Sequence, residues 1–296
     1  MNKQILCIIS GVILIQLMSV QVFAQATSEP ALSVTHYQSD ERYAFGLKLL
    51  DLALSQQDTP YDIKKASGPE VNEGRGERQL LAGRVDLQWL LTTPEREEHF
   101  IAIRVPIYRG LLGLRLLLVS RKRLESMSQI RTLSDLRHYT GGHGRHWSDL
   151  SVFAANNMPV VTNVSYEALF KQLKIGDFDY FHRGINEVWP ELNSHQDSLA
   201  VADGVMLFYP NPVYFFVNKD RPELAKKIEL GLQAALKNGS YKKLFLASYA
   251  EVIKESQLPS RSLIRLKNPN LSPYFPAIDT SWWLPNQLKS KFSQSQ

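Results

Sequence analysis

The feature that most constrains this chain is a regular alternation of short apolar segments with amphipathic ones, which begins at Ala31. In residues 42–56 the apolar side chains Phe45, Leu49 and Leu52 recur with the spacing of one helix face. The strands of this first unit are expected at 31–37, 61–66 and 84–91, and its helices at 42–56 and 76–83. This succession predicts an α/β fold with a mostly parallel sheet covered on both faces.

The same alternation continues through the middle of the chain and predicts a second α/β unit inside the first. The further strands are expected at 112–121, 177–182 and 212–219, with 139–147 as a strand followed by a glycine-bearing loop. The further helices are expected at 132–139, 164–176 and 221–255, the last as two helices split at Asn238-Gly239. We expect the long segments 112–121 and 212–219 to cross between two lobes that face a cleft. Small-molecule sites concentrate in such clefts, and hinge bending can close them.

The first 24 residues have the order of a secretory signal. One Lys at position 3 precedes an apolar run over 5–20, and Val22-Phe23-Ala24 ends in a small residue. A retained anchor is the alternative, but the run is short for a membrane span. The predicted organisation is therefore a signal peptide at 1–24, the first part of lobe 1 at 25–116, lobe 2 at 117–214, and a return to lobe 1 at 215–296 that ends in an irregular strap.

Composition excludes several classes of protein. The net charge is +5 and falls to +4 without the signal, with basic residues scattered among acids, so nucleic-acid binding has no support. Cys7 is the only cysteine and lies in the signal, which leaves neither disulfides nor thiol chemistry for the mature chain. No later segment approaches eighteen uninterrupted apolar residues, so we expect a soluble protein outside the cytoplasm.

Three stretches resemble a known family: GRVDLQWLLTTPEREEHFIAIRVPIYRG at 83–110, FKQLKIGDFDYFHRGINEV at 170–188, and FFVNKDRPELAKKIELGLQAALKNGSYKKLFLASY at 215–249. The chain is similar to the periplasmic solute-binding proteins of the polar amino-acid type, bacterial extracellular family 3. The resemblance implies a two-lobed type II periplasmic-binding-protein-like fold with a hinge of two crossing strands. It also implies a periplasmic receptor for a small-molecule ligand, with an ABC transporter permease or a membrane sensor as partner.

In that family an arginine after the third strand binds the ligand carboxylate with its planar fork. The resemblance gives this role to Arg96, with Thr92 and Thr93 beside it offering hydroxyl groups. The alternative is that Arg96 pairs with Glu95, Glu97 or Glu98 on a solvated turn.

The second lobe of the family usually adds a hydroxyl-rich loop and an acid for the ligand's ammonium group. Here the loop reads GGHGRHW, so Arg145, His146 and Trp147 replace small residues, unless this is an exposed loop with a buried Trp. His182-Arg183-Gly184 stands where the acid would fall. Since a cation cannot hold an ammonium group, an anionic or aromatic acid is the better candidate ligand.

Flat apolar walls could come from Trp89, Tyr37, Tyr108 and Phe181. The candidate ligand-binding residues are Arg96, Thr92, Thr93, Trp89, Tyr37, Tyr108, Arg145, His146, Trp147 and Arg183. The alternative to a solute-binding protein is an interaction or signalling module of the same fold that binds no small molecule.

Other chemistry finds little support in the motifs. His143 and His146 lie in a glycine-rich loop, with His182 and His195 elsewhere, so we expect solvated imidazoles and no metal site. No nucleophile elbow, zinc-protease motif or phosphate loop is present. We therefore predict a protein that is not an enzyme and uses no cofactor.

Overall fold

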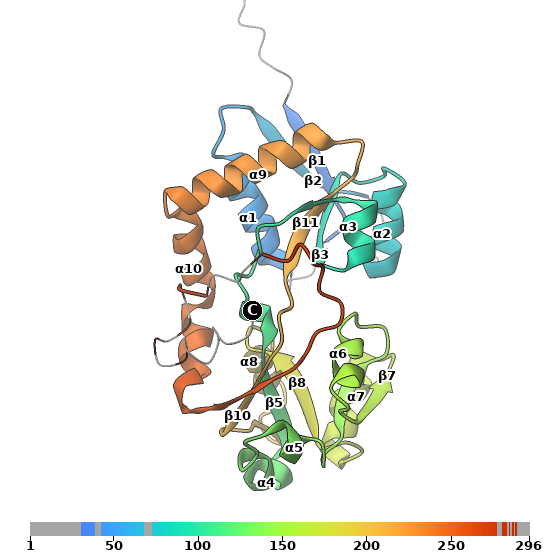
Figure 1. Ribbon diagram of the computed structural model, residues 1–296, viewed down its shortest axis with the longest axis vertical. Coiled ribbons are helices and arrows are strands. Elements are labelled where there is room, and N and C mark those ends of the chain that lie inside the picture. The colour runs from blue at the N-terminus through green and yellow to red at the C-terminus, as the bar shows by residue number, and fades with distance from the viewer. Residues whose placement is uncertain are drawn as a thin grey trace, which may run out of the picture. The chain divides into compact units, whose positions relative to one another are not determined.

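The computed structural model describes residues 31–38, 43–67, 73–276, 280–282, 284, 286 and 288 (Figure 1). The signal peptide proposed for 1–24 lies outside these residues and stays a prediction. Among the helices in the described ranges, none combines the length and the apolar character that a membrane crossing requires.

The first lobe, as we name it, holds two small sheets. Strands β1 (Leu32–His36) and β2 (Tyr61–Lys65) pair in parallel, and β3 (Leu87–Leu91), β11 (Val213–Val217) and β4 (Ile101–Ile103) form an antiparallel sheet in the order β3-β11-β4. The helices of this lobe are α1 (Ala44–Leu54), α2 (Glu73–Leu81), α3 (Pro94–His99), α9 (Pro222–Lys237) and α10 (Ser240–Glu255). The side chain of Gln38 joins the two sheets, because its amide bonds the backbone O and N of Trp89 at 2.6 and 2.9 Å.

The second lobe is built on one seven-stranded sheet in the order β12-β10-β5-β8-β6-β7, with β9 paired to β5. Its strands are β5 (Leu114–Ser120), β6 (Gly141–Gly144), β7 (Val160–Asn163), β8 (Tyr180–Gly184), β9 (Leu199–Val201), β10 (Val205–Phe208) and β12 (Ser262–Arg265). Its helices are α4 (Leu124–Ser128), α5 (Leu133–Leu136), α6 (Leu150–Ala155), α7 (Tyr166–Ile175) and α8 (Val188–Asn193). Short 3-10 turns occur at η2 (Leu111–Gly113), η3 (Arg121–Arg123) and η4 (Leu258–Ser260).

The predicted α/β class is confirmed, but the expectation of a mostly parallel arrangement is wrong. Strand β5 runs antiparallel to β8, β9 and β10, and β11 runs antiparallel to β3 and β4. The reason is topological: β5 and β11 enter their sheets directly after the chain has crossed from the other lobe, without a helical crossover that would restore the parallel direction.

The chain passes between the lobes in residues 104–113, 209–212 and 256–261. Strand β12, which lies in the segment expected to return to lobe 1, pairs with β10 in the second lobe. The predicted helix ends fit the structure well: α7 stops before Gly176, whose φ is 87°, and Gly239, with φ 80°, separates α9 from α10. These left-handed conformations suit glycine, which has no Cβ.

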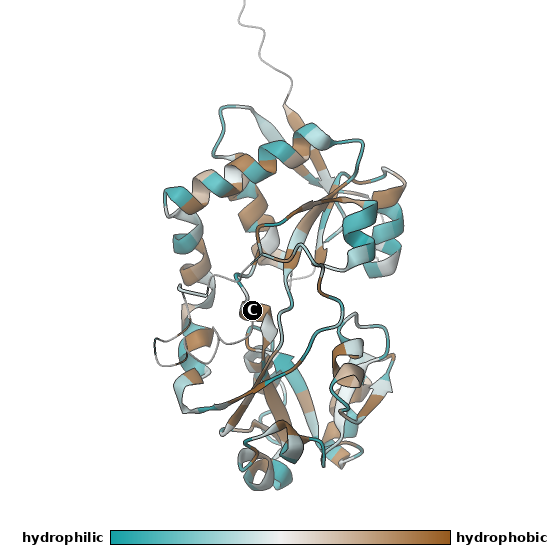
Figure 2. Cartoon of the chain, viewed as in Figure 1, coloured by the Kyte–Doolittle hydropathy of each residue, from teal (hydrophilic) through white to brown (hydrophobic). Residues whose placement is uncertain are grey.

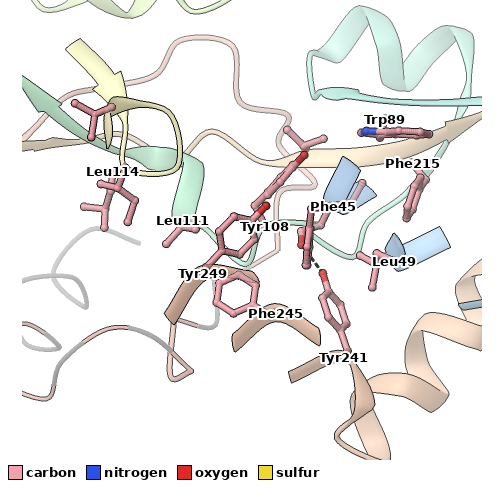
Figure 3. Close-up of a cluster of buried hydrophobic side chains, with 14 of the residues drawn as sticks. Phe45, Leu49, Trp89, Tyr108, Leu111, Leu114, Phe215, Tyr241, Phe245 and Tyr249 are labelled. Atoms are coloured by element: carbon pink, nitrogen blue, oxygen red, sulfur yellow. Dashed lines mark hydrogen bonds between the residues drawn. The ribbon is translucent and has the colours of Figure 1, made fainter. Parts of the chain in front are cut away.

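The core of the first lobe includes an aromatic cluster beside the first crossing segment (Figure 3). The ring of Phe45 lies 5.6 Å from that of Tyr108 and 4.9 Å from that of Tyr249. The hydroxyl of Tyr241 donates to the carbonyls of Pro106 and Ile107 at 2.9 and 2.7 Å, which holds the crossing segment in place. In Figure 2 the central strands are largely apolar while α2 and α3 present polar residues, the pattern expected of helices that cover a sheet.

Residues 266–276, which we call the strap, leave β12 and run past α6 toward α3 (Figure 1). In the second lobe Asn270 donates to the carbonyl of Ser148 at 3.0 Å and to the hydroxyl of Ser151 at 2.7 Å. In the first lobe the hydroxyl of Ser272 donates to Glu97 at 3.0 Å. Beyond the strap, Trp282 packs on Tyr241 with ring centroids 5.2 Å apart.

Candidate functional site

Arg96 is buried and its guanidinium is fully engaged by the protein. Thr93 caps α3 by accepting from the backbone N–H of Arg96 at 3.2 Å, and Pro94 opens the helix. The guanidinium donates to the carbonyl of Leu91 at 2.6 Å, to Glu77 at 2.5 Å and to Glu73. The acidic partners therefore come from α2, and the alternative that Arg96 pairs with Glu95, Glu97 or Glu98 on a solvated turn is wrong.

The hydroxyl of Thr92 is also committed within the protein. It donates to Glu97 at 2.6 Å, and Glu97 also accepts from Arg104 at 2.6 Å and from Ser272. Burial opposes ionisation of Glu97, but these donors outweigh it and hold the pKa of its carboxyl below the ordinary value. The side chains of residues 92–97 thus hold α2, α3 and the strap together through these hydrogen bonds and ion pairs.

Arg183 on β8, in the second lobe, is likewise paired with carboxylates of the protein. Its Nε and Nη2 donate to the carboxylate of Glu191 at 2.7 to 2.9 Å, and Glu187 lies 3.3 Å away. The guanidinium lies over the rings of Trp147 and Phe181, 4.9 and 4.8 Å from their centroids. Burial opposes the charge of Arg183, but the two carboxylates raise its pKa well above the ordinary value.

The loop after β6 presents the one predicted arginine that has no carboxylate partner within the described ranges. Arg145 and His146 are exposed, and only the backbone of Arg145 is engaged, by a bond to the carbonyl of Asn163 at 2.9 Å. Trp147 is half-buried, and its indole stacks on Phe181 at 5.9 Å with an interplanar angle of 14°. The structure therefore brings Trp147 and Arg183 together and leaves Arg145 open to solvent beside them.

The predicted aromatic walls lie mainly in the core. Trp89 is 1% exposed and packs over Gly46, where a Cβ would lie 2.4 Å from its Nε1. Tyr108 belongs to the aromatic cluster of Figure 3, and Tyr37 is half-buried against a smaller core cluster. In this structure these rings contact protein side chains, and their contact with a ligand stays a prediction.

The sequence reasoning missed a buried polar cluster in the second lobe. His143 on β6, Asp149 before α6 and His182 on β8 are 0%, 7% and 1% exposed. Oδ2 of Asp149 accepts from the hydroxyl of Tyr209 at 2.7 Å and from Arg115 at 3.3 Å. Oδ1 of the same carboxylate lies 3.3 Å from Nε2 of His143.

The expectation of a solvated imidazole is therefore wrong for His143, although it holds for the exposed His146. The physical reason is its packing: the ring of His143 lies 5.3 Å from that of Trp147, 5.2 Å from that of Phe153 and 5.0 Å from that of His182. The neighbouring Gly142 and Gly144 admit the Phe178 and Trp147 rings, from which a Cβ would lie 2.2 and 2.4 Å. Glycine alternating with histidine could have signalled a buried strand rather than a loop.

Electrostatics in the cluster follow from burial and close charges. Burial opposes ionisation of Asp149, but the contact with His143, whose Nε2 lies 3.3 Å from Oδ1, and the charge of Arg115 hold the pKa of its carboxyl well below the ordinary value. Burial and the neighbouring His143 lower the pKa of His182 well below that of an exposed histidine. Asp149 is thus a carboxylate and His182 a neutral imidazole at neutral pH.

No family model matches this chain, and a search of curated proteins finds no match. Solved structures do share the fold. AbpA of Streptococcus pneumoniae, an amino acid ABC transporter substrate-binding protein bound to L-arginine, matches with a TM-score of 0.52 and 16% identity over 75% of this chain and 95% of that one. The GluR0 ligand-binding core of Nostoc punctiforme in complex with L-glutamate gives a TM-score of 0.51 and 17% identity over 74% and 99%.

The second substrate-binding domain of GlnP from Lactococcus lactis, in an open conformation, matches with a TM-score of 0.51 and 15% identity over 74% of this chain and 94% of that one. The chain therefore has the two-lobed type II periplasmic-binding-protein fold expected from its resemblance to the amino-acid solute-binding proteins. At these identities the likeness concerns the fold and carries no information on the ligand.

Proposed function

We propose that this chain is an exported, periplasmic solute-binding protein that captures a small anionic or carboxylate-bearing solute for an ABC importer or a membrane sensor. The observation that carries the proposal is the fold, which spans 94 to 99% of three solved substrate- or ligand-binding chains. Two of those chains are described with L-arginine or L-glutamate bound, which supports binding over catalysis as the activity of this fold. The leader-like first 24 residues support export.

The contacts of the arginines favour Arg145 as the cation that meets the solute. An anion at Arg96 would have to displace Glu73 and Glu77, and one at Arg183 would have to displace Glu191. Separating a buried ion pair leaves an uncompensated charge, which costs several kcal/mol. Arg145 needs no such exchange, and Trp147 beside it offers a flat apolar surface.

Thermal-shift screening of the mature chain against organic acids, amino acids and their conjugates tests this proposal, because a ligand that binds the folded state raises the melting temperature. We expect at least one acid to raise it and Arg145→Ala to remove the shift. Arg84→Ala, which changes an exposed arginine of the first lobe, is the matched control and should keep the shift. A shift that survives Arg145→Ala but is lost in folded Arg96→Ala would return the anchor to Arg96.

The second candidate function is an interaction or signalling module of the same fold that binds no small molecule. The internal pairing of Arg96 and Arg183 with carboxylates is the observation that favours it. Under this proposal no acid in a broad library would shift the melting temperature. Affinity capture from a periplasmic extract would instead recover one protein partner in stoichiometric amount.

A further inference from the structure

We propose that His143, Asp149 and His182 form a binding site for one divalent transition-metal ion such as Zn²⁺ or Co²⁺. The three residues come from β6, the turn before α6, and β8. One ligand atom from each lies within 4.8 Å of the others. Imidazole nitrogen and carboxylate oxygen are ligands that these ions take in proteins. None of these three residues is proposed for solute capture, so the metal site is independent of that function.

The separation of the donor atoms suits a metal. Nε2 of His143 and Oδ1 of Asp149 are 3.3 Å apart. Two ligands that each lie about 2.1 Å from a tetrahedral zinc ion are roughly 3.4 Å apart. The ring of His182 lies 5.0 Å from that of His143 with an interplanar angle of 31°, which places a third donor beside the pair.

The hydrogen bonding of His143 gives an independent reason. Its Nδ1 lies 2.8 Å from the carbonyl oxygen of Gly144, and since a carbonyl can only accept, Nδ1 carries the proton. Without a second ring proton, Nε2 presents a lone pair to a carboxylate oxygen 3.3 Å away, and within the described part of the chain Nε2 makes no hydrogen bond. Two facing acceptors need a positive group between them, either a metal ion or a second ring proton.

The surrounding groups resemble the outer shell of a metal site. A metal-binding histidine usually donates its second N–H to a carbonyl or carboxylate, as His143 does to Gly144. Tyr209 and Arg115 both donate to Oδ2 of Asp149, which orients the carboxylate and leaves Oδ1 for a metal. Nδ1 of His182 is buried and without a hydrogen bond among the described residues, so this ring has a free nitrogen to offer.

The local charge does not oppose a cation. Two arginines, Arg115 and Arg183, are balanced by the carboxylates of Asp149, Glu187 and Glu191, all joined to them by ion pairs of 2.7 to 3.3 Å. With neutral imidazoles the group carries one net negative charge. A divalent ion therefore enters a site with a slight excess of carboxylate rather than an unpaired cationic pocket.

The test uses the mature protein after treatment with a chelator, with Zn²⁺ measured by calorimetry and Co²⁺ by its visible absorption. We expect one ion per chain and Co²⁺ bands typical of a protein-bound ion. His143→Gln and His182→Ala should each weaken binding more than about tenfold, since even outer-shell changes cost that much. His146→Ala, three residues from His143 but exposed, is the matched control and should bind as the unchanged protein does.

Three results would overturn the proposal. An unchanged protein that binds neither ion shows that a second proton on His143, not a metal, separates the two acceptors. Binding that persists in both His143→Gln and His182→Ala places the ion elsewhere. Equal loss in His146→Ala indicates chelation by the exposed loop. Because the first result needs no variant, the proposal can fail even if a substitution prevents folding.

Discussion

At the scale of single residues, the contacts of an arginine decide whether its charge is available to a solute. Arg96 pairs with Glu73 and Glu77 on α2, which are 23 and 19 residues away in the sequence but adjacent in the fold. Position in a motif could identify Arg96, but no property of the sequence nearby could reveal its carboxylate partners. The same is true of His143, whose ring packs on Phe153 and His182.

Glu97 offers a prediction that depends on pH. Its donors hold the pKa of the folded carboxyl below the ordinary value of 4.5, so its stabilisation is present above that value and is lost as the pH falls through the folded pKa. Glu97→Gln should lower the free energy of unfolding at pH 7 by about 1 to 3 kcal/mol, the range for hydrogen bonds to a charged group. Urea denaturation at a series of pH values measures the difference, which should shrink in acid.

Glu98→Gln is the control, because Glu98 is the next residue on α3 and is exposed. It should change the unfolding free energy little at any pH. Equal effects of the two substitutions, or a Glu97→Gln effect that grows in acid, would show that the donors around Glu97 do not stabilise its charged form.

At the scale of elements, periodicity predicted the long helices and several strands, among them β1, β2 and β3, but missed the shortest elements. Residues 42–56 and 221–255 gave α1, α9 and α10 because several turns repeat the same buried face. Strands β9 and β10 span only three and four residues, which is too short to show the alternating pattern of a strand in the sequence. Residues 94–99 were interpreted as a turn and form α3, whose cap by Thr93 lies within the motif that drew attention to Arg96.

The packing of α1 against α9 gives a second prediction. A Cβ on Gly231 of α9 would lie 1.9 Å from the backbone oxygen of Ala53 on α1, and backbone cannot rotate away. Gly231→Ala should therefore force the helices apart and lower the unfolding free energy by about 1 to 3 kcal/mol, the usual cost of overpacking. Thermal and urea denaturation would measure the loss.

Gly74→Ala is a matched control on α2, where Gly74 is exposed and the Cβ would meet nothing closer than the Arg78 side chain at 4.0 Å. Alanine favours helix over glycine by up to about 1 kcal/mol, so this variant should be unchanged or slightly more stable. A Gly231→Ala protein as stable as Gly74→Ala would mean that α1 and α9 are less closely packed than described.

At the scale of the whole molecule, the sequence indicated the two-lobed fold, but not how the strap joins the lobes. The segment was expected to be irregular, and it is, yet its contacts alternate between lobes: Asn270 bonds Ser148 and Ser151 beside α6, and Ser272 bonds Glu97 on α3. These hydrogen bonds depend on which residues lie close together in the folded chain. A segment without a periodic pattern does not indicate which residues those are. A two-lobed protein that closes by hinge bending must move its lobes while these contacts of the strap hold.

The strap should therefore limit how far the lobes separate. The double substitution Asn270→Ala and Ser272→Ala removes one attachment to each lobe, so we expect a longer mean distance and a broader distribution between them. The mature chain lacks cysteine once residues 1–24 are removed, so Arg78→Cys on α2 and Glu167→Cys on α7, both exposed, can carry two spin labels without a background thiol. Pulsed electron resonance then measures the distance.

The control pair is Ser126→Ala and Ser248→Ala, two serines whose hydroxyls bond only carbonyls within their own lobes, at 3.0 Å in each case. These variants should leave the distance distribution unchanged. If the Asn270→Ala and Ser272→Ala protein folds normally yet gives the same distribution as this control, the three hydrogen bonds of Asn270 and Ser272 do not restrain the lobes. In that case the three crossings at 104–113, 209–212 and 256–261 alone set the range of motion. A broader distribution would instead make the strap a determinant of affinity under the proposed solute-binding function, because a protein that spends less time in its binding-competent state binds proportionally more weakly.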